Sequence, residues 1–325
     1  MTVPPTIFWT GATGFFGKAV LRNLQSNGPQ GYEWKLLSRD PECFARQWPD
    51  LASLPSTTWH RGDIIQSTPD LRFPLTHFVH AAADSTSAGY LSDMQRFDQI
   101  VEGTRRMLDL AVACGARRFL FTSSGGVYGR QPSGLSGIPE DYLGMPDPLN
   151  ASNVYSVGKR AAEHLCALYA KERGLEIVIA RCFAFVGQDL PLNVHFAIGN
   201  FIRDALWADE IVVNGDGTPI RSYLDQRDLT RWLLTLLKDG KACEAYNVGS
   251  DQAISIGDLA YVVRDIVSPG KPVRILGEPV NNAERSRYVP DIRKIHLHLG
   301  LRPTYSLEQS ILDTAATARV RGRPS

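Results

Sequence analysis

The 325-residue sequence lacks the features that mark several classes of protein. No apolar run approaches the roughly 20 residues that span a bilayer, and the net charge is only +1, so we expect neither a membrane nor nucleic acid as a partner. The five cysteines are widely spaced and form no C-x-x-C pair, which indicates reduced thiols. The seven histidines are scattered, and we expect no metal site. The first residues lack the pattern of a signal peptide, so a cytoplasmic protein is expected.

A glycine-rich stretch near the start of the sequence is its most informative local pattern. It reads Thr10-Gly11-Ala12-Thr13-Gly14-Phe15-Phe16-Gly17 and lies between an apolar run at 7–9 and a helix-like pattern at 19–24. Its G-x-x-G-x-x-G spacing is one residue longer than the G-x-G-x-x-G dinucleotide fingerprint. Glycines let a pyrophosphate approach the free N–H groups of a helix N-terminus. The stretch therefore predicts a strand, a phosphate-binding turn and a helix.

Continuous apolar strands alternate with amphipathic helices over the first half of the chain. Strands are predicted over 33–38, 76–83, 118–122 and 176–180, with helices over 91–114 and 154–173. This pattern indicates an α/β fold, a Rossmann doubly wound parallel sheet covered on both faces. Residues 131–150, rich in Pro and Gly, predict a loop over the site. The last residues, 318–325, are expected to fray.

Two hydroxyls and an amine form a candidate catalytic group. Tyr155 and Lys159 are four residues apart on a predicted helix and share one face. A nearby ammonium lowers the pKa of a phenol, which makes a tyrosine a usable acid or base. Ser124 follows the buried strand at 118–122, where its hydroxyl can bond a substrate oxygen. A surface Tyr–Lys pair and a polar strand end are the alternative interpretations.

These residues together resemble the extended short-chain dehydrogenase/reductase family, in its sugar-nucleotide epimerase, dehydratase and reductase branch. The glycine turn is similar to the family's T-G-x-x-G-x-x-G, and Tyr155 with Lys159 to its Tyr-x-x-x-Lys. Further similar stretches are Arg61-Gly62-Asp63-Ile64, His80-Ala81-Ala82-Ala83, Ser123 to Gly129, Gly215 to Thr218, Arg221-Ser222-Tyr223, Tyr246 to Gly249, and Asp291 to Pro303.

The resemblance implies a Rossmann domain for NAD or NADP over residues 1–185 and a smaller α/β, mainly nucleotide-sugar-binding domain over 186–325, with the option that the two interleave. Tyr155 would exchange a proton with a sugar hydroxyl, usually at C4. Ser124 would hold the substrate oxygen, and Lys159 would bind the nicotinamide ribose and lower the pKa of Tyr155. The implied cofactor-binding residues are Gly11, Thr13, Gly14, Phe15, Phe16, Gly17, Ser38, Arg39, Asp63, Ile64, Ala81, Ala82, Ala83, Thr122, Tyr155 and Lys159.

The implied substrate is a nucleoside-diphosphate sugar. In relatives, the arginine that matches Arg221 contacts the diphosphate of this substrate. The other substrate-binding candidates, besides Ser124, are Asp84, Ser85, His195, Phe196, Asn200 and Arg287. Arg287 falls where relatives often place a second arginine that binds the diphosphate. The helices near 92–114 and 153–173 resemble those that pair into a four-helix bundle in family dimers, which implies a homodimer.

Departures from the family pattern narrow the expected reaction. Dehydratases of this branch carry Asp-Glu where this chain has Gly125 and Gly126, and UDP-glucuronate decarboxylases keep a Glu matching Gly126. Glycine transfers no proton, so 4,6-dehydration and decarboxylation are disfavoured. An epimerase acting through a 4-keto intermediate remains, with an NADP-dependent 4-keto sugar-nucleotide reductase as the alternative. A non-catalytic NAD(P)-binding sensor and a small-carbonyl reductase are the rival classes. Ala184 replaces a family Asn near the substrate, so the sugar or its pose is expected to be unusual.

Arg39 bears on the choice of cofactor. NAD-dependent members usually end the second strand in Asp or Glu, which binds the ribose diol. An arginine suits a 2′-phosphate instead, since its guanidinium matches phosphate geometry. The alternative is a solvated arginine paired with Asp40 or Glu42. NAD and NADP both stay open on the sequence.

Overall fold

A computed structural model describes residues 4–69, 71, 73–83, 91–278 and 286–323. Within these residues the main feature is a seven-stranded sheet in the order β11-β6-β5-β4-β1-β2-β3. Every neighbouring pair in it is parallel. From the central β1–β4 pair, the strands follow one another outward in both directions: β1, β2 and β3 toward one edge, and β4, β5, β6 and β11 toward the other. This strand order confirms the predicted Rossmann fold. The strands are β1 (Thr6–Thr10), β2 (Glu33–Ser38), β3 (Thr57–Arg61), β4 (His77–His80), β5 (Arg118–Ser124), β6 (Glu176–Cys182) and β11 (Glu244–Val248).

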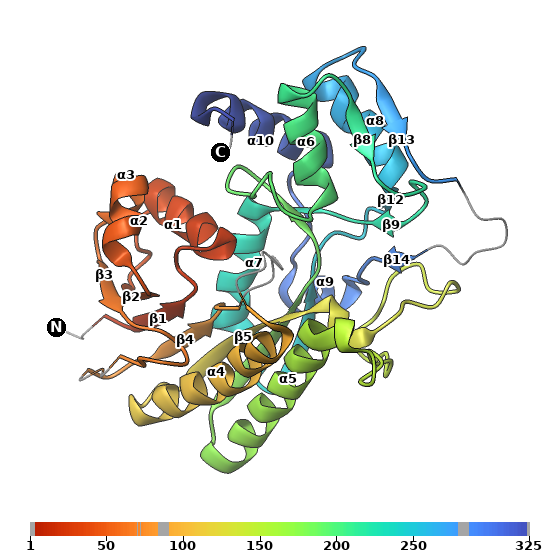
Figure 1. The fold of residues 1–325 in the computed structure, drawn as a ribbon. Coiled ribbons are helices and arrows are strands. Elements are labelled where there is room, and N and C mark those ends of the chain that lie inside the picture. Colours follow the sequence, from red (N-terminus) through yellow and green to blue (C-terminus); the bar gives the residue numbers. More distant parts are fainter. Residues whose placement is uncertain (1–3, 70, 72, 84–90, 279–285, 324–325) are drawn as a thin grey trace.

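Helices cover both faces of this sheet (Figure 1). α4 (Asp93–Ala113) and α5 (Val154–Arg173) pack side by side on one face, and α1 (Phe15–Asn27) and α7 (Gln226–Asp239) on the other. The side chains of β1 show how both faces of the sheet are buried. Ile7 and Trp9 pack in the core formed with α1 and α7, while Phe8 between them packs in the core formed with α4 and α5. Two short helices, α2 (Pro41–Gln47) and α3 (Pro49–Ala52), lie between β2 and β3.

A second lobe lies beyond one edge of the sheet, at the top of Figure 1. Its core joins α6 (Ala197–Trp207), α8 (Ile256–Val267) and α10 (Leu307–Arg321) with the paired strands β8 (Ile211–Val213) and β13 (Val273–Ile275). Between these segments the chain returns to the central sheet through α7 and β11. The domain boundary at residue 185 stays a prediction.

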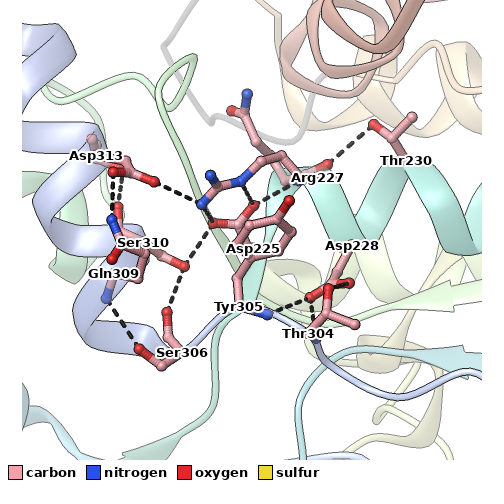
Figure 2. A network of polar contacts seen from close by, with 12 residues as sticks. Asp225, Arg227, Asp228, Thr230, Thr304, Tyr305, Ser306, Gln309, Ser310 and Asp313 are labelled. Carbon is pink, nitrogen blue, oxygen red and sulfur yellow. Dashed lines mark hydrogen bonds and ion pairs between the residues drawn. The ribbon is translucent and has the colours of Figure 1, made fainter. Parts of the chain in front are cut away.

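Polar contacts fasten the last helix to the start of α7 (Figure 2). The Asp225 carboxylate accepts a hydrogen bond from Ser310 Oγ at 2.7 Å and one from Arg227 Nη2 at 2.8 Å. The Asp228 carboxylate accepts from the backbone N and from Oγ1 of Thr304, both at 2.7 Å. This network fixes the segment that follows β9 (Ile220–Arg221) and β10 (Leu224–Asp225) in the chain.

The expectation of a frayed end at 318–325 is wrong for the described part. Helix α10 continues to Arg321, with Ala318 buried. Arg319 Nη2 donates to the oxygen of Val267 at 2.8 Å, and Arg321 reaches the buried carboxylate of Asp189 at 3.2 Å. The partners lie 52 and 132 residues away, so local composition could not reveal them.

Candidate active site

The glycine turn forms an open cradle between β1 and α1. Gly11 has φ +74°, and a Cβ there would lie 2.6 Å from the oxygen of Ala81 at the end of β4. Gly17 touches the Ala12 backbone so closely that no Cβ would fit. Gly14 is the N-cap of α1, and within the described residues no side chain caps that end. The first N–H groups of α1 thus stay free for an anion, and these residues fit a dinucleotide pyrophosphate.

The remaining predicted residues of the turn differ in exposure. Thr13 is exposed at its tip. Phe15 and Phe16 are partly buried against Phe185, with ring centroids 6.4 and 5.3 Å away. The two rings therefore help to fix the start of α1 beside the second half of the molecule.

The ends of β1 and β4 are joined by side-chain hydrogen bonds. Thr10 Oγ1 lies 2.8 Å from Nδ1 of His80 and accepts from the backbone N–H groups of Ala81 and Ala82 at 3.1 and 3.2 Å. Burial, and secondarily the charge of Lys159, lowers the pKa of His80 to about 3. His80 is therefore neutral at physiological pH. Ala83 follows as the last residue described before position 91.

At the end of β2, Arg39 is exposed and Ser38 is buried. The Ser38 hydroxyl accepts from the backbone N of Asp40 at 3.2 Å. Arg61, on β3, pairs with Glu42 and lies 3.9 Å from Asp40. Among the described residues the Arg39 side chain makes no hydrogen bond or ion pair. The pairing of Arg39 with Asp40 or Glu42 is thus not seen, because Arg61 takes both acids.

Asp63 and Ile64 lie just beyond β3. Asp63 Oδ1 accepts from the backbone N–H groups of Ile65 and Gln66 at 2.7 and 3.0 Å, so the carboxylate shapes its own turn. Ile64 is buried, and a Cβ on Gly103 of α4 would lie 2.8 Å from its Cδ1. In this structure Asp63 stabilises the turn after β3 and Ile64 packs in the core beside α4. Their contact with a cofactor stays a prediction.

Ser124, Tyr155 and Lys159 come from the end of β5 and the first turns of α5. Lys159 is buried, and its Nζ donates to the backbone oxygen of Thr122 at 2.7 Å. Nζ lies 5.8 Å from the centre of the Tyr155 ring. Burial lowers the pKa of Lys159 to about 8. Thr122 Oγ1 donates to the His80 oxygen at 3.1 Å, which joins this group to β4 and the glycine turn.

Ser124 is the N-cap of a short 3-10 turn, η1 (Gly125–Tyr128). Its Oγ accepts from the backbone N of Gly126 at 3.1 Å. A side chain at either following glycine would meet neighbours: Phe183 at 2.7 Å from position 125, and Ser156 from position 126. Ser124 therefore has no acidic or basic side chain beside it in sequence, and none fits without rearrangement.

Tyr288 is a residue of this site that the sequence did not single out. Its hydroxyl lies 3.4 Å from Ser124 Oγ although the two residues are 164 positions apart. From this strand the sequence predicts only Arg287 as a substrate-binding residue. Nothing in the local sequence links Tyr288 to Ser124.

The two arginines expected at the diphosphate lie on neighbouring strands. Arg221, on β9, donates to the backbone oxygens of Ile220 and Ser286 at 2.8 and 3.2 Å, and burial lowers its pKa. Arg287, on β14 (Arg287–Tyr288), donates from Nε to the oxygen of Ser136 at 2.9 Å. Arg287 thus holds the 131–150 loop, and its diphosphate role stays a prediction.

A cavity of about 750 Å³ lies in the second lobe, beside α6 and β8. The candidates His195 and Asn200 line it. Pro219 also lines it and lies two residues before Arg221 in the sequence. Phe196 packs on His195, with ring centroids 4.5 Å apart. Asp84 and Ser85 lie outside the described residues. The lining residues that the sequence did not single out include Arg203, Asp204, Val212, Val213 and Asn214.

Among the described residues, no group of three or more His, Cys, Asp or Glu side chains is placed to hold a metal ion. No helix within the same residues is both long and apolar enough to cross a bilayer.

The fold and the Ser–Tyr–Lys group beside a glycine turn define a dinucleotide-binding α/β protein of the short-chain dehydrogenase/reductase type. The chain belongs to the NAD dependent epimerase/dehydratase family, whose model matches residues 7–249. Membership confirms the resemblance and the predicted cofactor class, NAD or NADP, and makes this chain an enzyme of that family.

Curated relatives include UDP-glucuronic acid decarboxylase 1 of Xenopus tropicalis, 31% identical over 245 residues, which are 75% of this chain and 57% of that protein. UDP-glucuronic acid decarboxylase 3 of Arabidopsis thaliana is also 31% identical over 245 residues, 75% of this chain and 70% of the relative. The chain thus spans little more than half the length of the first of these relatives.

Similar solved structures cover nearly the whole chain. UDP-glucuronic acid 4-epimerase from Bacillus cereus, in complex with UDP-glucuronic acid and NAD, has a TM-score of 0.82 at 23% identity, over 98% of this chain and 100% of that one. RMD from Pseudomonas aeruginosa, complexed with NADPH, has a TM-score of 0.80 at 26% identity, over the same shares of the two chains. The first likeness, at its low identity, concerns the fold alone.

Proposed function

We propose that this chain is an NAD(P)-dependent epimerase of a nucleoside-diphosphate sugar, acting through a 4-keto intermediate. One observation carries the proposal: Lys159 is anchored beneath Tyr155 by the end of the strand that presents Ser124. A sensor that only binds the cofactor has no need of this arrangement. A small-carbonyl reductase has no need of a cavity of about 750 Å³.

The cofactor would lie along the carboxyl edge of the sheet, with its pyrophosphate at the glycine turn and the N-terminus of α1. A bound nicotinamide would supply reversible hydride transfer to and from the sugar carbon. The protein supplies position and charge. Gly11 allows close approach of the backbone, and Thr10 holds the ends of β1 and β4 together.

Tyr155 would take the proton of the C4 hydroxyl as that carbon is oxidised, and would return it when the keto group is reduced from the other face. Ser124 would donate its hydroxyl hydrogen to the same oxygen while its Oγ accepts from Gly126. A charged Lys159 stabilises the phenolate of Tyr155. With a pKa of about 8, the Lys159 amine carries that charge at neutral pH.

The cavity beside α6 and β8 is of the size that encloses a small ligand, and Pro219, two residues before Arg221 in sequence, lines it. A nucleoside there would place its diphosphate at the Arg221 guanidinium and its sugar toward Ser124. UDP-glucuronic acid is the first substrate to test, because the decarboxylases and the 4-epimerase to which this chain is similar are named for this compound.

Epimerisation is favoured over dehydration or decarboxylation by Gly125 and Gly126. Neither residue transfers a proton, and the space beside both is filled by Phe183, Tyr288 and Ser156. The acid or base that those reactions need on this turn is therefore missing.

A second candidate, an NADP-dependent 4-keto sugar-nucleotide reductase, is favoured by Arg39. Its guanidinium is exposed at the end of β2 and, within the described residues, bonds to no other side chain. A 2′-phosphate would give it a partner. The reduction would use the same Ser124, Tyr155 and Lys159 in the reverse direction.

We also propose a homodimer through α4 and α5. The two helices pack against each other on one face of the sheet, and each carries an exposed apolar side chain, Val112 and Leu168. Size-exclusion chromatography with light scattering would test this, and a monomer would contradict it.

The reaction is tested by incubating the protein with UDP-glucuronic acid and NAD or NADP and following the sugar by NMR. The proposal predicts the C4 epimer without release of CO₂. Tyr155→Phe, which keeps the ring, should abolish most of the turnover. Decarboxylation, or unchanged turnover in the variant, would contradict the proposal. Oxidation of NADPH by a 4-keto sugar nucleotide, with no epimer from the parent sugar, would favour the reductase.

A further inference from the structure

The ammonium of Lys159 lies over the ring of Phe121. Phe121 is on β5, three residues before Ser124, and is fully buried. Lys159 Nζ lies 4.7 Å from the centre of this ring, nearer than the 5.8 Å between Nζ and the centre of the Tyr155 ring. A cation within about 6 Å of an aromatic centroid is attracted to the negative face of the ring. Of the two rings, Phe121 is therefore the one closer to the charge of Lys159.

Few other groups stabilise this buried charge. Lys159 Nζ donates one hydrogen bond, to the backbone oxygen of Thr122, and among the described residues it forms no ion pair. The carboxylate of Glu163, one turn further along α5, accepts from Arg181 at 3.0 and 2.8 Å instead. A buried charge costs free energy unless nearby groups compensate it. The Phe121 ring is thus one of the few direct contacts that can keep Lys159 charged.

The titratable groups around Lys159 come from β4, β6 and α5, and they are His80, Cys182, Tyr155, Glu163 and Cys166. His80 pairs with Phe121 in the register of β4 and β5, and their rings stack with centroids 5.8 Å apart. Burial lowers the pKa of His80 to about 3 and raises the pKa of the Cys182 thiol to about 12. Burial also raises the pKa of the Cys166 thiol. The imidazole and both thiols are therefore uncharged at physiological pH, and none of them replaces the ring as a partner of the ammonium.

We propose that Phe121 is a positioning residue for the reaction: its ring face holds the amine of Lys159 in the charged form and in place beside Tyr155. The kinetic consequence rests on the proposed function, in which a charged Lys159 stabilises the phenolate of Tyr155. An aliphatic side chain at position 121 would still fill the core but would offer no negative ring face. The ammonium would then lose its proton at a lower pH, and the phenolate would lose the charge beside it.

Graded fluorination of the Phe121 ring tests this role with little change in shape, because each fluorine withdraws negative charge from the ring face. NMR of lysines labelled with carbon-13 at the ε position measures the pKa of Lys159 without requiring turnover. The chain has eight lysines, and Lys159→Met assigns the signal. We expect the pKa of Lys159 to fall stepwise, by up to about one pH unit for a trifluorinated ring. The alkaline limb of kcat/KM should move to lower pH by the same amount.

Phe119 is the matched control, because it lies two residues earlier on β5, is equally buried and belongs to the same core. Its ring stacks on Phe78, with centroids 5.1 Å apart, and within the described part of the chain it contacts no cation. Fluorination there should leave the pKa of Lys159 and the alkaline limb unchanged. Phe121→Leu, which removes the ring, should lower the pKa of Lys159 at least as far as trifluorination, and Phe119→Leu should not change it.

A pKa of Lys159 that is the same with every ring at position 121, or that moves equally for the two positions, would overturn the role of Phe121. If this pKa follows the ring but the alkaline limb stays fixed, Phe121 has no part in the reaction and the proposal fails. If the pKa follows the ring and no sugar nucleotide is turned over, the proposed function fails, while the stabilisation of the Lys159 charge by Phe121 is established.

Discussion

The Lys159 ammonium donates a hydrogen bond to the backbone oxygen of Thr122 at 2.7 Å. This one bond ties the second turn of α5 to the end of β5, and so fixes the rotation of the helix that carries Tyr155 relative to the strand that carries Ser124. Because Lys159 is buried, the contact also partly replaces the water that the ammonium loses. The relative placement of all three catalytic candidates depends on it.

The alkaline limb of the pH–rate profile should report Lys159. Its pKa is lowered to about 8, so the ammonium is present below that pH and is lost above it. We expect kcat/KM to fall above about pH 8, since this parameter follows the free enzyme. Lys159→Met should lower kcat/KM by about 10²- to 10⁴-fold and remove this limb. If the alkaline limb persists in the Lys159→Met variant, it reports the titration of a group other than Lys159.

His80 should make the fold sensitive to acid. Its pKa is about 3 in the folded protein against 6.5 for the free side chain. Between these values the unfolded chain binds the proton and the folded protein does not, so stability falls as the pH drops below 6.5. The contribution is at most about 1.4 kcal/mol per pH unit. Chemical denaturation at pH 7 and pH 5 should show a smaller loss in His80→Gln than in the unaltered protein. Equal losses would contradict the account.

Gly11→Ala should weaken dinucleotide binding at least tenfold, because the new Cβ would lie 2.6 Å from the Ala81 oxygen and force the cradle apart. Gly174→Ala is the control. Gly174 has a similar φ, +68°, but nothing lies within 4 Å of its Cβ position. Both variants carry the cost of a left-handed alanine, roughly 1–2 kcal/mol. Fluorescence titration with the reduced cofactor separates the two, and equal affinities would exclude a phosphate at this turn.

Arg39→Ala should raise the Kd for NADPH at least tenfold and leave that for NADH nearly unchanged, if the exposed guanidinium binds a 2′-phosphate. Arg46→Ala, at an exposed arginine in the last turn of α2, serves as the control. An unaltered protein that prefers NADH, together with an inert Arg39→Ala, would remove the main support for the reductase.

The central sheet was predictable because its signals are local. The apolar runs that became β1, β5 and β6, and the helical spacing of α4 and α5, each lie within one segment. Helix α5 begins at Val154 and ends at Arg173 as expected. Strand β3 was missed because its residues are at most half-buried and show no continuous apolar run.

The catalytic candidates were found because Tyr155 and Lys159 are four positions apart on one helix, a spacing that can be recognised whatever surrounds them. The contact of Tyr288 with Ser124 was hidden because it depends on Gly125, Phe183 and the pairing of β14 with β9. Arg287 was assigned to a diphosphate from its position in sequence, yet its guanidinium meets a loop carbonyl at Ser136. Contacts between segments more than 100 residues apart leave no trace in either segment alone.

The most direct test of the central claim uses UDP-glucuronic acid labelled with deuterium at C4. The account predicts that the C4 epimer forms with the deuterium still on C4, because the carbon is oxidised and reduced within one closed site without exchange with water. Tyr155→Phe should slow this conversion by about 10²- to 10⁴-fold. Loss of the label to solvent, release of CO₂, or equal rates in the two proteins would contradict it.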